Sequence, residues 1–348
     1  MRAMIPRCGA ALGLGLVLAE PAVAAPPMTL DQALVAAYKT NPQLLAERAN
    51  LRAVDEGVPK ALSGWRPTVI VSGSAWYTSG TEHTFLGPIT TSTDASRDTD
   101  TEQATITQPI FQGGKTRASV FQAENLMRAE RAQLIATEGT VFGSVVSAYV
   151  GVIENRGLVE VNHNNVTVLQ EQLKSNQDRF NVGELTQTDV AQAEAALALG
   201  QSQLATAQGN LETALATYVK VVGEPAGKLL DPQPLLLPVS SESAADRMAA
   251  ANNPTVINAL FNVAASKNAV DVAFATLMPS LSVQGSAFRE DNPQLPHTRI
   301  TGWAATINLA VPLYQGGGEY ASVRQAKQEQ DKSVQTLDNA RRTAVQQA

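Results

Sequence analysis

Two long apolar repeats meet at the segment RFNVGELTQTDV, Arg179 to Val190. Before it, apolar residues recur every seven positions: Val145, Val152, Val159, Val166, Leu173 and Phe180. After it, a second series recurs at Val190, Leu197, Leu204, Leu211 and Tyr218, with small residues at Ala193, Gly200, Ala207 and Ala214. Such a repeat is typical of a coiled-coil seam, and small residues let helix backbones approach closely. The sequence therefore predicts a helical hairpin over residues 113–221.

The turn of this hairpin is predicted at residues 181–188. Gly183 can adopt the positive φ that closes the first helix, and Thr188 or Asp189 can cap the second by accepting hydrogen bonds from its free N–H groups. A first helix of about 67 residues, at about 1.5 Å each, would be about 100 Å long. A compact soluble domain of this size has no need of such a helix.

Composition excludes several classes of partner and chemistry. The chain has a net charge of −6, whereas a nucleic-acid-binding surface needs an excess of basic residues. The three histidines, His83, His163 and His297, are predicted in a loop, a helix and a loop, without the spacing of a metal site or a catalytic pair. We therefore expect no nucleic-acid partner, no metal, no cofactor and no catalytic residue.

Residues 1–24 are predicted to be a signal peptide. Two arginines precede an apolar run at 10–19, and a small-residue cleavage site follows at 22–24. The alternative is an ordinary buried N-terminal helix. The single cysteine, Cys8, precedes the apolar run, so we expect the mature chain to have no lipid-bearing cysteine and no disulfide.

Helical periodicity follows the signal. Thr29 to Gln32 has a capping-box pattern, and Asn41-Pro42 begins a longer helix that continues to about Gly64, with a kink predicted at Gly57 and Pro59. We expect no later transmembrane helix, because no stretch reaches about 18 to 20 apolar residues. Any crossing of a membrane would then use β-strands.

The period changes from about 3.6 to 2 after Pro67. Over residues 68–77, apolar or small side chains alternate with mainly polar ones, as in a membrane strand that faces a wet lumen. A second strand is predicted over 101–111. Between them, residues 78–100 are rich in Thr, Ser and Asp and are predicted to form a long exposed loop. Its acidic residues, expected to face the cell exterior, are Glu82, Asp94, Asp98 and Asp100.

This pattern occurs twice in the chain. Asn253-Pro254 matches Asn41-Pro42, and the sequence PLYQGG at 312–317 matches PIFQGG at 109–114. The second copy is predicted to contain a strand pair over 279–288 and 303–314 and the start of a second long helix. The predicted division is a signal peptide at 1–24, a first repeat at 25–222, a linker at 223–240 and an incomplete second repeat at 241–348.

Together these motifs resemble the TolC-like outer membrane efflux protein family. The resemblance covers nearly everything after the signal, including the Asn-Pro helix starts, both QGG turns and the tip. It implies a mainly helical protein with membrane β-strands, in which long antiparallel coiled-coil hairpins form an α-barrel. Each chain of a homotrimer would lend four strands to one outer-membrane β-barrel. Four strands cannot close a barrel alone, because small membrane barrels use about eight.

The resemblance also implies partners and sites. The tip would dock to a periplasmic adaptor carried by an inner-membrane pump, through Arg179, Val182, Gly183, Glu184, Thr188 and Asp189. Glu184 stands where some members have an apolar residue. Asp189 matches a position involved in closing the periplasmic mouth, and its other reading is a plain helix cap. Residue 348 corresponds to Val145 of the first repeat, so we expect a C-terminally truncated chain.

Two further groups of residues belong to the predicted barrel. The turns from strand to helix are predicted at Gln112, Gly113, Gly114, Gln315, Gly316 and Gly317. Aromatic residues at strand ends predict a membrane-interface girdle, with the core of a soluble sheet as the alternative. They are Trp65, Trp76, Tyr77, Phe111, Trp303 and Tyr314.

The sequence therefore favours a passive exit duct for type I protein secretion or multidrug efflux, bound to outer-membrane lipid and powered by its inner-membrane partner. The Thr-Asp-Val tip and the position of Cys8 favour protein secretion over lipoprotein drug efflux. One rival is a soluble periplasmic coiled-coil adaptor or scaffold, which would have no membrane strands. The other is a secreted enzyme, which would need a catalytic constellation.

Overall fold

The computed structural model describes residues 28–234, 241–293 and 297–348. The predicted signal peptide lies outside the described residues, as do residues 235–240 of the predicted linker. The chain divides into two compact units. One comprises residues 1–37 and 145–233, and the other comprises residues 38–144 and 234–348.

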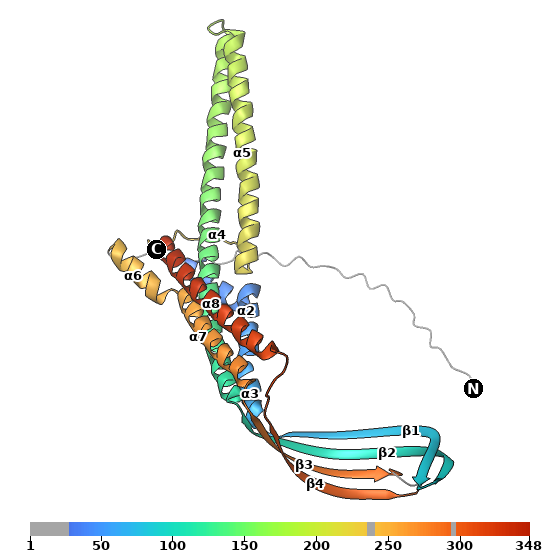
Figure 1. The fold of residues 1–348 in the computed structure, drawn as a ribbon. Helices are drawn as coiled ribbons and strands as arrows, with labels where there is room; N and C mark the ends of the chain where they lie inside the picture. Colours follow the sequence, from blue (N-terminus) through green and yellow to red (C-terminus); the bar gives the residue numbers. More distant parts are fainter. Residues whose placement is uncertain (1–27, 235–240, 294–296) are drawn as a thin grey trace, which may run out of the picture. The chain divides into compact units, whose positions relative to one another are not determined.

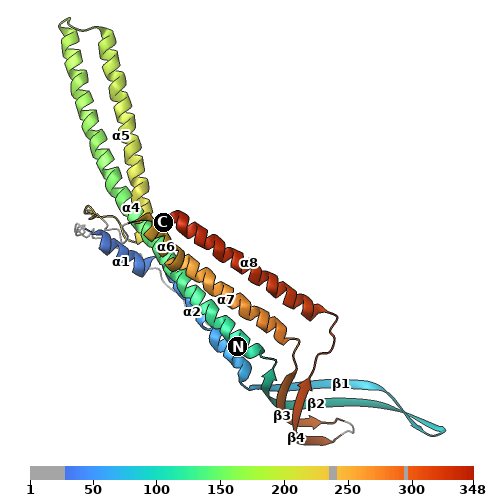
Figure 2. The same cartoon turned by 60° about the vertical axis from the view of Figure 1, so that its left-hand side comes forward.

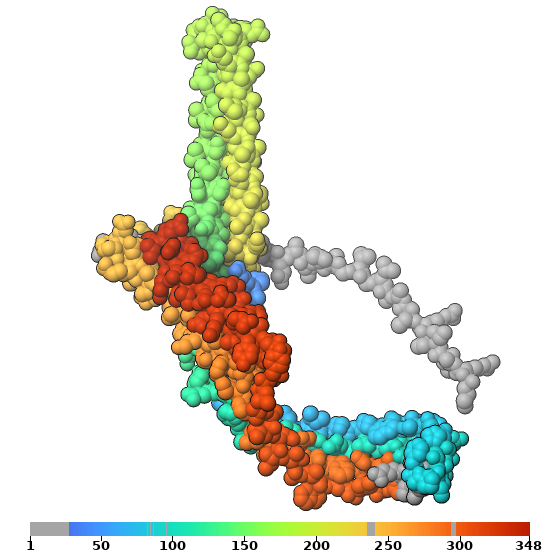
Figure 3. Space-filling model, in the orientation of Figure 1, coloured from blue at the N-terminus to red at the C-terminus, as the bar shows by residue number. Residues whose placement is uncertain are grey.

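The first unit is built on a helical hairpin. Helix α4 (Lys115–Asn181), from Val145 onward, lies beside α5 (Gln187–Val222), and the two limbs touch along the face drawn in Figure 3 (Figures 1 to 3). The predicted seam is confirmed, because its positions are buried or half-buried in both limbs, with Phe180 as the exposed exception. At Gly200 an added Cβ would lie 2.8 Å from the side chain of Leu169. The small residues therefore do bring the backbones close together.

The chain that follows α5 is anchored on α4. Gly223, at φ 89°, ends α5. The hydroxyl group of Tyr149 lies 2.9 Å and 2.6 Å from the carbonyl oxygens of Met28 and Leu230, and the N–H of Leu230 donates to it. Arg156 donates to two carbonyl groups of this segment, at Ala226 and Gly227. Burial raises the pKa of the Tyr149 hydroxyl, which therefore stays protonated and able to donate at neutral pH.

The second unit contains the remaining helices and the sheet. Asn41 and Asn253 both cap helices, because each side chain accepts hydrogen bonds from backbone N–H groups just after the following proline. Helices α7 and α8 lie side by side, with Val256, Ala259, Leu337 and Ala344 buried between them (Figure 2). The helix bounds are α1 Leu30–Thr40, α2 Pro42–Asp55, α3 Gly57–Leu62, the 3₁₀ helix η1 Ser63–Trp65, α6 Glu242–Asn252, α7 Pro254–Ala275 and α8 Gly318–Gln347.

A four-stranded antiparallel sheet completes this unit, in the order β1-β2-β3-β4. The strands are β1 Thr68–Leu86, β2 Ile89–Gln112, β3 Ser280–Asp291 and β4 Arg299–Ala310. The observed arrangement of helical hairpin and β-strands confirms the predicted fold class.

The predicted loop at 78–100 is wrong. Strands β1 and β2 pair without interruption from Thr68 and Thr107 to Leu86 and Ile89, so His83 and the acidic residues of the expected loop all lie in strands. Threonine favours the extended backbone, and a two-residue link containing Gly87, at φ 65°, allows a tight hairpin. Polar composition favours a loop, but a strand pair that is mainly polar on both faces has the same composition.

The second strand pair differs from its predicted bounds. Strand β3 continues to Asp291, and β4 begins at Arg299, so the connection is shorter than expected. Strand β4 ends at Ala310, before Pro312, which has no N–H group for the sheet. In the first repeat the equivalent Pro109 lies in β2, where the register with β3 shifts between Pro109 and Phe111.

One described helix, α4, is long and apolar enough to cross a membrane by length and composition. It contains an 18-residue window of mean hydropathy 1.3, of which 33% is buried. This corrects the expectation that no such stretch follows the signal. Length and composition alone do not place a helix in a membrane, since core helices of soluble proteins share both.

Candidate functional site

The strand register separates the sheet into two chemically different faces, because residues paired across antiparallel strands share a face and successive residues alternate. We call one the apolar face, and its members are Val69, Val71, Ala104, Ile106, Leu281, Val283, Ala287, Trp303, Ile307 and Leu309. It is open to its surroundings, with Val71 78% and Trp303 81% exposed. A soluble sheet would normally cover such a face.

The opposite face is mainly polar. Its polar members are Ser72, Ser74, Gln103, Thr105, Ser282, Gln284, Ser286, Thr306 and Asn308, and the apolar Ile70, Trp76, Phe288 and Ile300 also lie on it. Asn308 donates a hydrogen bond to Gln284 along this face at 3.3 Å. One exposed apolar face and one polar face together form the arrangement of a membrane strand with lipid on one side and a wet lumen on the other.

The sheet has two open edges. Strands β1 and β4 are the outermost in the order, and each pairs with a single strand among the described residues. An edge strand presents free backbone N–H and C=O groups that can pair with another chain. In a membrane such groups must be satisfied, so the edges require a further strand on each side.

The first strand-to-helix turn depends on its glycines. Gly113 and Gly114 have φ values of 61° and 85°, in the left-handed region that favours glycine. A Cβ at Gly113 would collide with the side chain of Met278 and lie 2.8 Å from the carbonyl oxygen of Ala275, whereas one at Gly114 would meet open space. The hydroxyl group of Thr116 donates to the side chain of Gln112 at 3.1 Å, which links the end of β2 to the start of α4.

The second strand-to-helix turn has similar backbone φ values, but its glycines are less closely packed. Gly316 and Gly317 have φ values of 72° and 81°, and Gly317 is the N-cap residue of α8. A Cβ at either glycine would meet nothing within 4 Å. Gln315 lies between the end of β4 and this helix, outside any strand. The paired QGG motifs therefore share a conformation and differ in packing.

The six predicted girdle aromatics fall into two groups along the strands. Trp65, Phe111 and Tyr314 lie at the helical end of the sheet, and Tyr314 lies after β4 has ended. Trp76, Tyr77 and Trp303 lie further along the strands, well before the end of β1. Tyr77 shares the face of Trp303, but Trp76 lies on the polar face. Trp76 is therefore misplaced for a lipid-facing girdle, and the placement of the others at a membrane interface stays a prediction.

The structure brings two predicted docking residues together at the hairpin tip. The guanidinium group of Arg179 donates to the carboxylate of Glu184 at 3.1 Å, and the Glu184 N–H donates to the Arg179 carbonyl group at 2.9 Å. Gly183, at φ 81°, allows this reversal. Val182 is 72% exposed and Phe180 is also exposed, so the tip presents apolar side chains close in sequence to an ion pair.

The cap of α5 is Thr186, not Thr188 or Asp189. Thr186 accepts from the Asp189 N–H, and the Asp189 carboxylate accepts from the Thr186 N–H at 2.8 Å, which forms a capping box. The Thr186 hydroxyl and N–H hold the pKa of Asp189 below its ordinary value. The motif Thr-x-x-Asp could have identified this cap from the sequence. Thr188 is exposed in the first turn of the helix.

Metal and catalytic sites were not expected from the sequence. Among the described residues, no group of three or more His, Cys, Asp or Glu side chains could hold a metal ion. The absence of cofactors and of catalysis stays a prediction.

Comparisons with known proteins agree on one family. The family model described as outer membrane efflux protein matches residues 33–224 and 247–348. The outer membrane efflux protein BepC of Brucella suis is 33% identical over 304 residues, covering 86% of this chain and 64% of BepC. The alkaline protease secretion protein AprF of Pseudomonas aeruginosa is 28% identical over 266 residues, covering 72% of this chain and 54% of AprF.

The fold agrees with a solved channel. The crystal structure of the CmeC outer membrane channel of Campylobacter jejuni matches with a TM-score of 0.74 at 19% identity, covering 90% of this chain and 68% of CmeC. The chain spans less than two thirds of the length of BepC and AprF. The predicted resemblance and outer-membrane location are confirmed: this chain belongs to the outer membrane efflux protein family.

Proposed function

We propose that this chain is one subunit of a homotrimeric outer-membrane channel, a passive exit duct for type I protein secretion or multidrug efflux. The observation that carries the proposal is the sheet, with an exposed apolar face, a polar face and two open edges. Membership of the outer membrane efflux protein family supports it. The duct is passive in this proposal, and energy comes from an inner-membrane partner.

The sheet geometry supports a ring of identical chains. Strands alternate in direction from β1 to β4, so β4 of one chain can pair antiparallel with β1 of the next and continue the alternation. Such a head-to-tail contact closes into a ring when the rotation between copies allows it. Three copies would give about twelve strands, an even number within the range of bacterial barrels.

The hairpin tip supports a docking role. Val182 is exposed, and the bond from Arg179 to Glu184 fixes the two charged side chains beside it. An apolar anchor with a polar surround is typical of a protein interface. We propose that this tip, with Gly183, Thr188 and Asp189, binds a periplasmic adaptor that connects to an inner-membrane pump.

The cargo has two candidates, each favoured by one observation. BepC is named as an efflux protein, and it is the more similar of the two relatives described here. AprF is named for secretion of an alkaline protease, and the Thr188-Asp189-Val190 tip favours that branch. A wide duct selects mainly through its partners, so both belong to the proposal.

Both rivals fit the chain less well. A soluble periplasmic adaptor would not need an exposed apolar sheet face, and the family's outer-membrane location opposes it. A secreted enzyme is opposed by relatives named for efflux and secretion. That the chain itself catalyses nothing is part of the proposal.

The proposal is tested by expressing the complete reading frame and fractionating the membranes. The detergent-extracted outer-membrane fraction is run unheated on a native gel, beside a heated sample as the control. We expect a trimer that dissociates on heating. A soluble monomer in the periplasmic fraction would overturn the barrel assignment and favour the soluble adaptor.

A further inference from the structure

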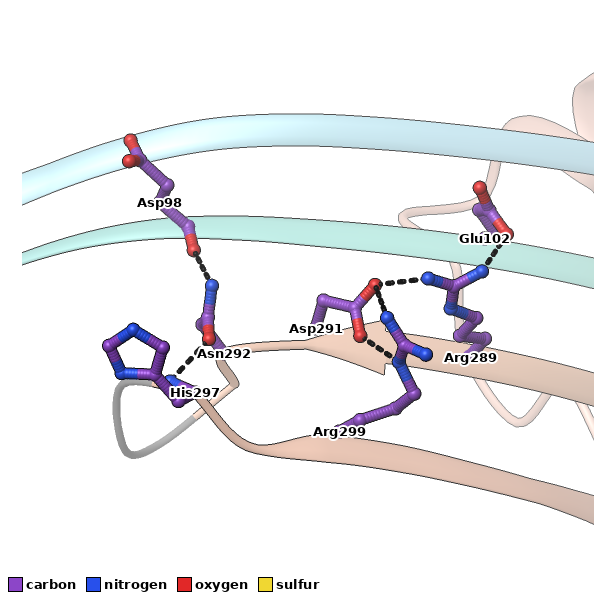
Figure 4. Close-up of polar contacts among 7 residues, drawn as sticks. All are labelled: Asp98, Glu102, Arg289, Asp291, Asn292, His297 and Arg299. Carbon is purple, nitrogen blue, oxygen red and sulfur yellow. Dashed lines mark hydrogen bonds and ion pairs between the residues drawn. The ribbon is translucent and has the colours of Figure 1, made fainter.

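A compact group of charged side chains lies across three strands of the sheet (Figure 4). We call it the arginine cluster, and its members are Glu102, Arg289, Asp291 and Arg299. Arg289 donates to the Asp291 carboxylate at 2.8 Å, and Arg299 donates to both oxygens of the same carboxylate through Nε and Nη2. Glu102 lies 3.9 Å from Arg289. One carboxylate therefore holds two guanidinium groups side by side.

The cluster lies on the same face as the apolar residues. The register pairs Glu102 with Arg289 and Asp291 with Arg299, and it pairs Ala287 with Trp303. Arg289 is two residues beyond Ala287, so the apolar face gives way to charge within about 7 Å along β3. The exposed Trp303, which pairs with Ala287, is on the last apolar row of paired residues before the charged residues begin.

The spacing along β3 fits the depth of a membrane. From Leu281 to Ala287 the apolar residues cover about 20 Å of strand, and the charged row begins about 27 Å along the strand from Leu281, which is about 20 Å of membrane depth at a tilt of about 40°. Barrels have an apolar band about 25 Å tall, bordered by aromatic residues at both interfaces. Arg289 is the ninth residue counted from Leu281, and a tilted strand crosses the membrane in about 9 to 11 residues, so the arginine cluster lies at the border of the apolar band.

Both arginines keep some N–H donors free of the contacts with Asp291 and Glu102. An arginine has five N–H donors in a planar fork that matches phosphate oxygens. Arg289 and Arg299 have side chains that are 43% and 61% exposed, whereas the Asp291 side chain between them is only 22% exposed. The Nε of Arg289 is buried without a hydrogen-bond partner in the described chain. Both guanidinium groups are therefore partly exposed, while the carboxylate that bridges them is the more buried partner.

The neighbouring connection is held in place on β2. Asn292, at φ 55°, donates to the carbonyl group of Asp98 and accepts from the N–H of His297 (Figure 4). Thr99 donates to the Asn292 carbonyl group. These bonds fix both ends of the connection between β3 and β4. Arg299, at the start of β4, is therefore kept opposite Asp291.

We propose that the arginine cluster binds the phosphate groups of a phosphorylated glycolipid in the outer leaflet. The proposal rests on the proposed function, in which the apolar face contacts lipid. The cluster is at the end of the strands remote from α7, and hence at the leaflet away from the periplasm, where the phosphate-bearing lipid of an outer membrane is a glycolipid. Asp98 and Asp100 on the same face can accept the divalent counter-ions that accompany such phosphates.

The test compares two variants that both break the ion pairs of Asp291 with Arg289 and Arg299. Arg289→Gln with Arg299→Gln removes both cations, and Asp291→Asn removes only the carboxylate between them. The trimer from the complete reading frame is titrated in detergent with diphosphorylated lipid A, with dephosphorylated lipid A and with phosphatidylglycerol, and bound lipid is counted by native mass spectrometry. We expect the double variant to bind diphosphorylated lipid A about tenfold more weakly, while Asp291→Asn binds it as the natural chain does.

Each other outcome overturns the proposal. Equal losses in both variants would mean that the cluster serves only the structure of the sheet. Unchanged binding in the double variant would place the glycolipid elsewhere. Binding of dephosphorylated lipid A as tight as that of the phosphorylated form would exclude phosphate recognition. Phosphatidylglycerol binding that is equally tight and equally dependent on the arginines would exclude the glycolipid.

A separate readout distinguishes failure of this proposal from failure of the proposed function. Trp65, Trp76 and every other tryptophan of the complete reading frame except Trp303 are replaced by Phe, so that Trp303 alone reports by tryptophan fluorescence, and the trimer is placed in vesicles whose acyl chains are brominated. Quenching of Trp303 shows that the apolar face contacts lipid, whatever the arginine cluster does. If Trp303 fluorescence is not quenched, the assignment of the sheet to a membrane barrel is wrong.

Discussion

At the scale of single residues, Gly113 is the glycine whose replacement we expect to be tolerated least. Gly113 and Gly114 share a positive φ, but Gly113 alone faces Met278 and the Ala275 carbonyl group. We expect Gly114→Ala to cost about 1 to 2 kcal/mol, from the left-handed conformation. Gly113→Ala should cost distinctly more, because the added methyl group also has no room. Thermal unfolding of the two detergent-extracted variants measures the difference, and equal midpoints would contradict the packing argument.

Asp189 should make the start of α5 sensitive to acid. Its pKa is lowered in the folded chain by hydrogen bonds from the Thr186 hydroxyl and N–H. A lowered pKa means that the capping contribution is present above the ordinary value of 3.8 and is lost as pH falls through the folded pKa. Hydrogen exchange of the first turn of α5 should therefore quicken, beyond the intrinsic change in exchange rate, as the solution is acidified.

Two variants distinguish the pH dependence caused by the capping box from that of general acid unfolding. Asp189→Asn should remove the extra pH dependence in this turn while the rest of the hairpin is unchanged. Thr186→Ala should weaken the helix start by about 1 kcal/mol at neutral pH. If Asp189→Asn leaves the pH profile of the first turn unchanged, the capping box is not its cause.

At the scale of elements, the coiled-coil seam depends on small residues on one helix. Gly200 lies against Leu169, whereas Gly209 on the same helix has nothing within 4 Å of an added Cβ. We expect Gly209→Leu to stabilise the hairpin by about 0.5 to 1 kcal/mol, because leucine has the higher helix propensity. Gly200→Leu should destabilise it, because the larger side chain forces the limbs apart. Helical content followed by circular dichroism on heating measures both, and a gain in midpoint for Gly200→Leu would refute the close approach.

The elements also show where sequence patterns succeed and fail. Asn-Pro motifs placed the helix starts at Asn41 and Asn253 because capping is a local interaction of three residues. The distal half of the β1–β2 hairpin was missed because its side chains are polar on both faces, so neither alternation nor apolar content distinguished it from a loop. The regular pairing of this part of β1 comes from backbone hydrogen bonds with β2, which no local pattern of side chains records.

At the scale of the whole molecule, the two faces of the sheet decide where the protein can reside. Ile307 and Thr306 are neighbours on β4 that lie on opposite faces. Ile307→Lys should prevent outer-membrane assembly or destabilise it by about 2 to 4 kcal/mol, because a lysine would face lipid near the middle of the apolar band. Thr306→Lys, the same charge on the polar face, should leave the trimer intact. Heat-resistant trimer on an unheated gel is the readout, and equal effects of the two lysines would argue that neither face contacts lipid.

The sequence by itself determined the helical hairpin, the family and the parts of the strands that lie nearest the helices. Seven-residue spacing in one limb and two-residue alternation in the first strand are properties of the chain that hold wherever its partners lie. The tertiary structure alone decided the arginine cluster, because register places Glu102 of β2 opposite Arg289 of β3, although the two strands are far apart in sequence. Pairing between distant strands depends on hydrogen bonds formed across the sheet, and no local pattern records which residue will stand opposite another.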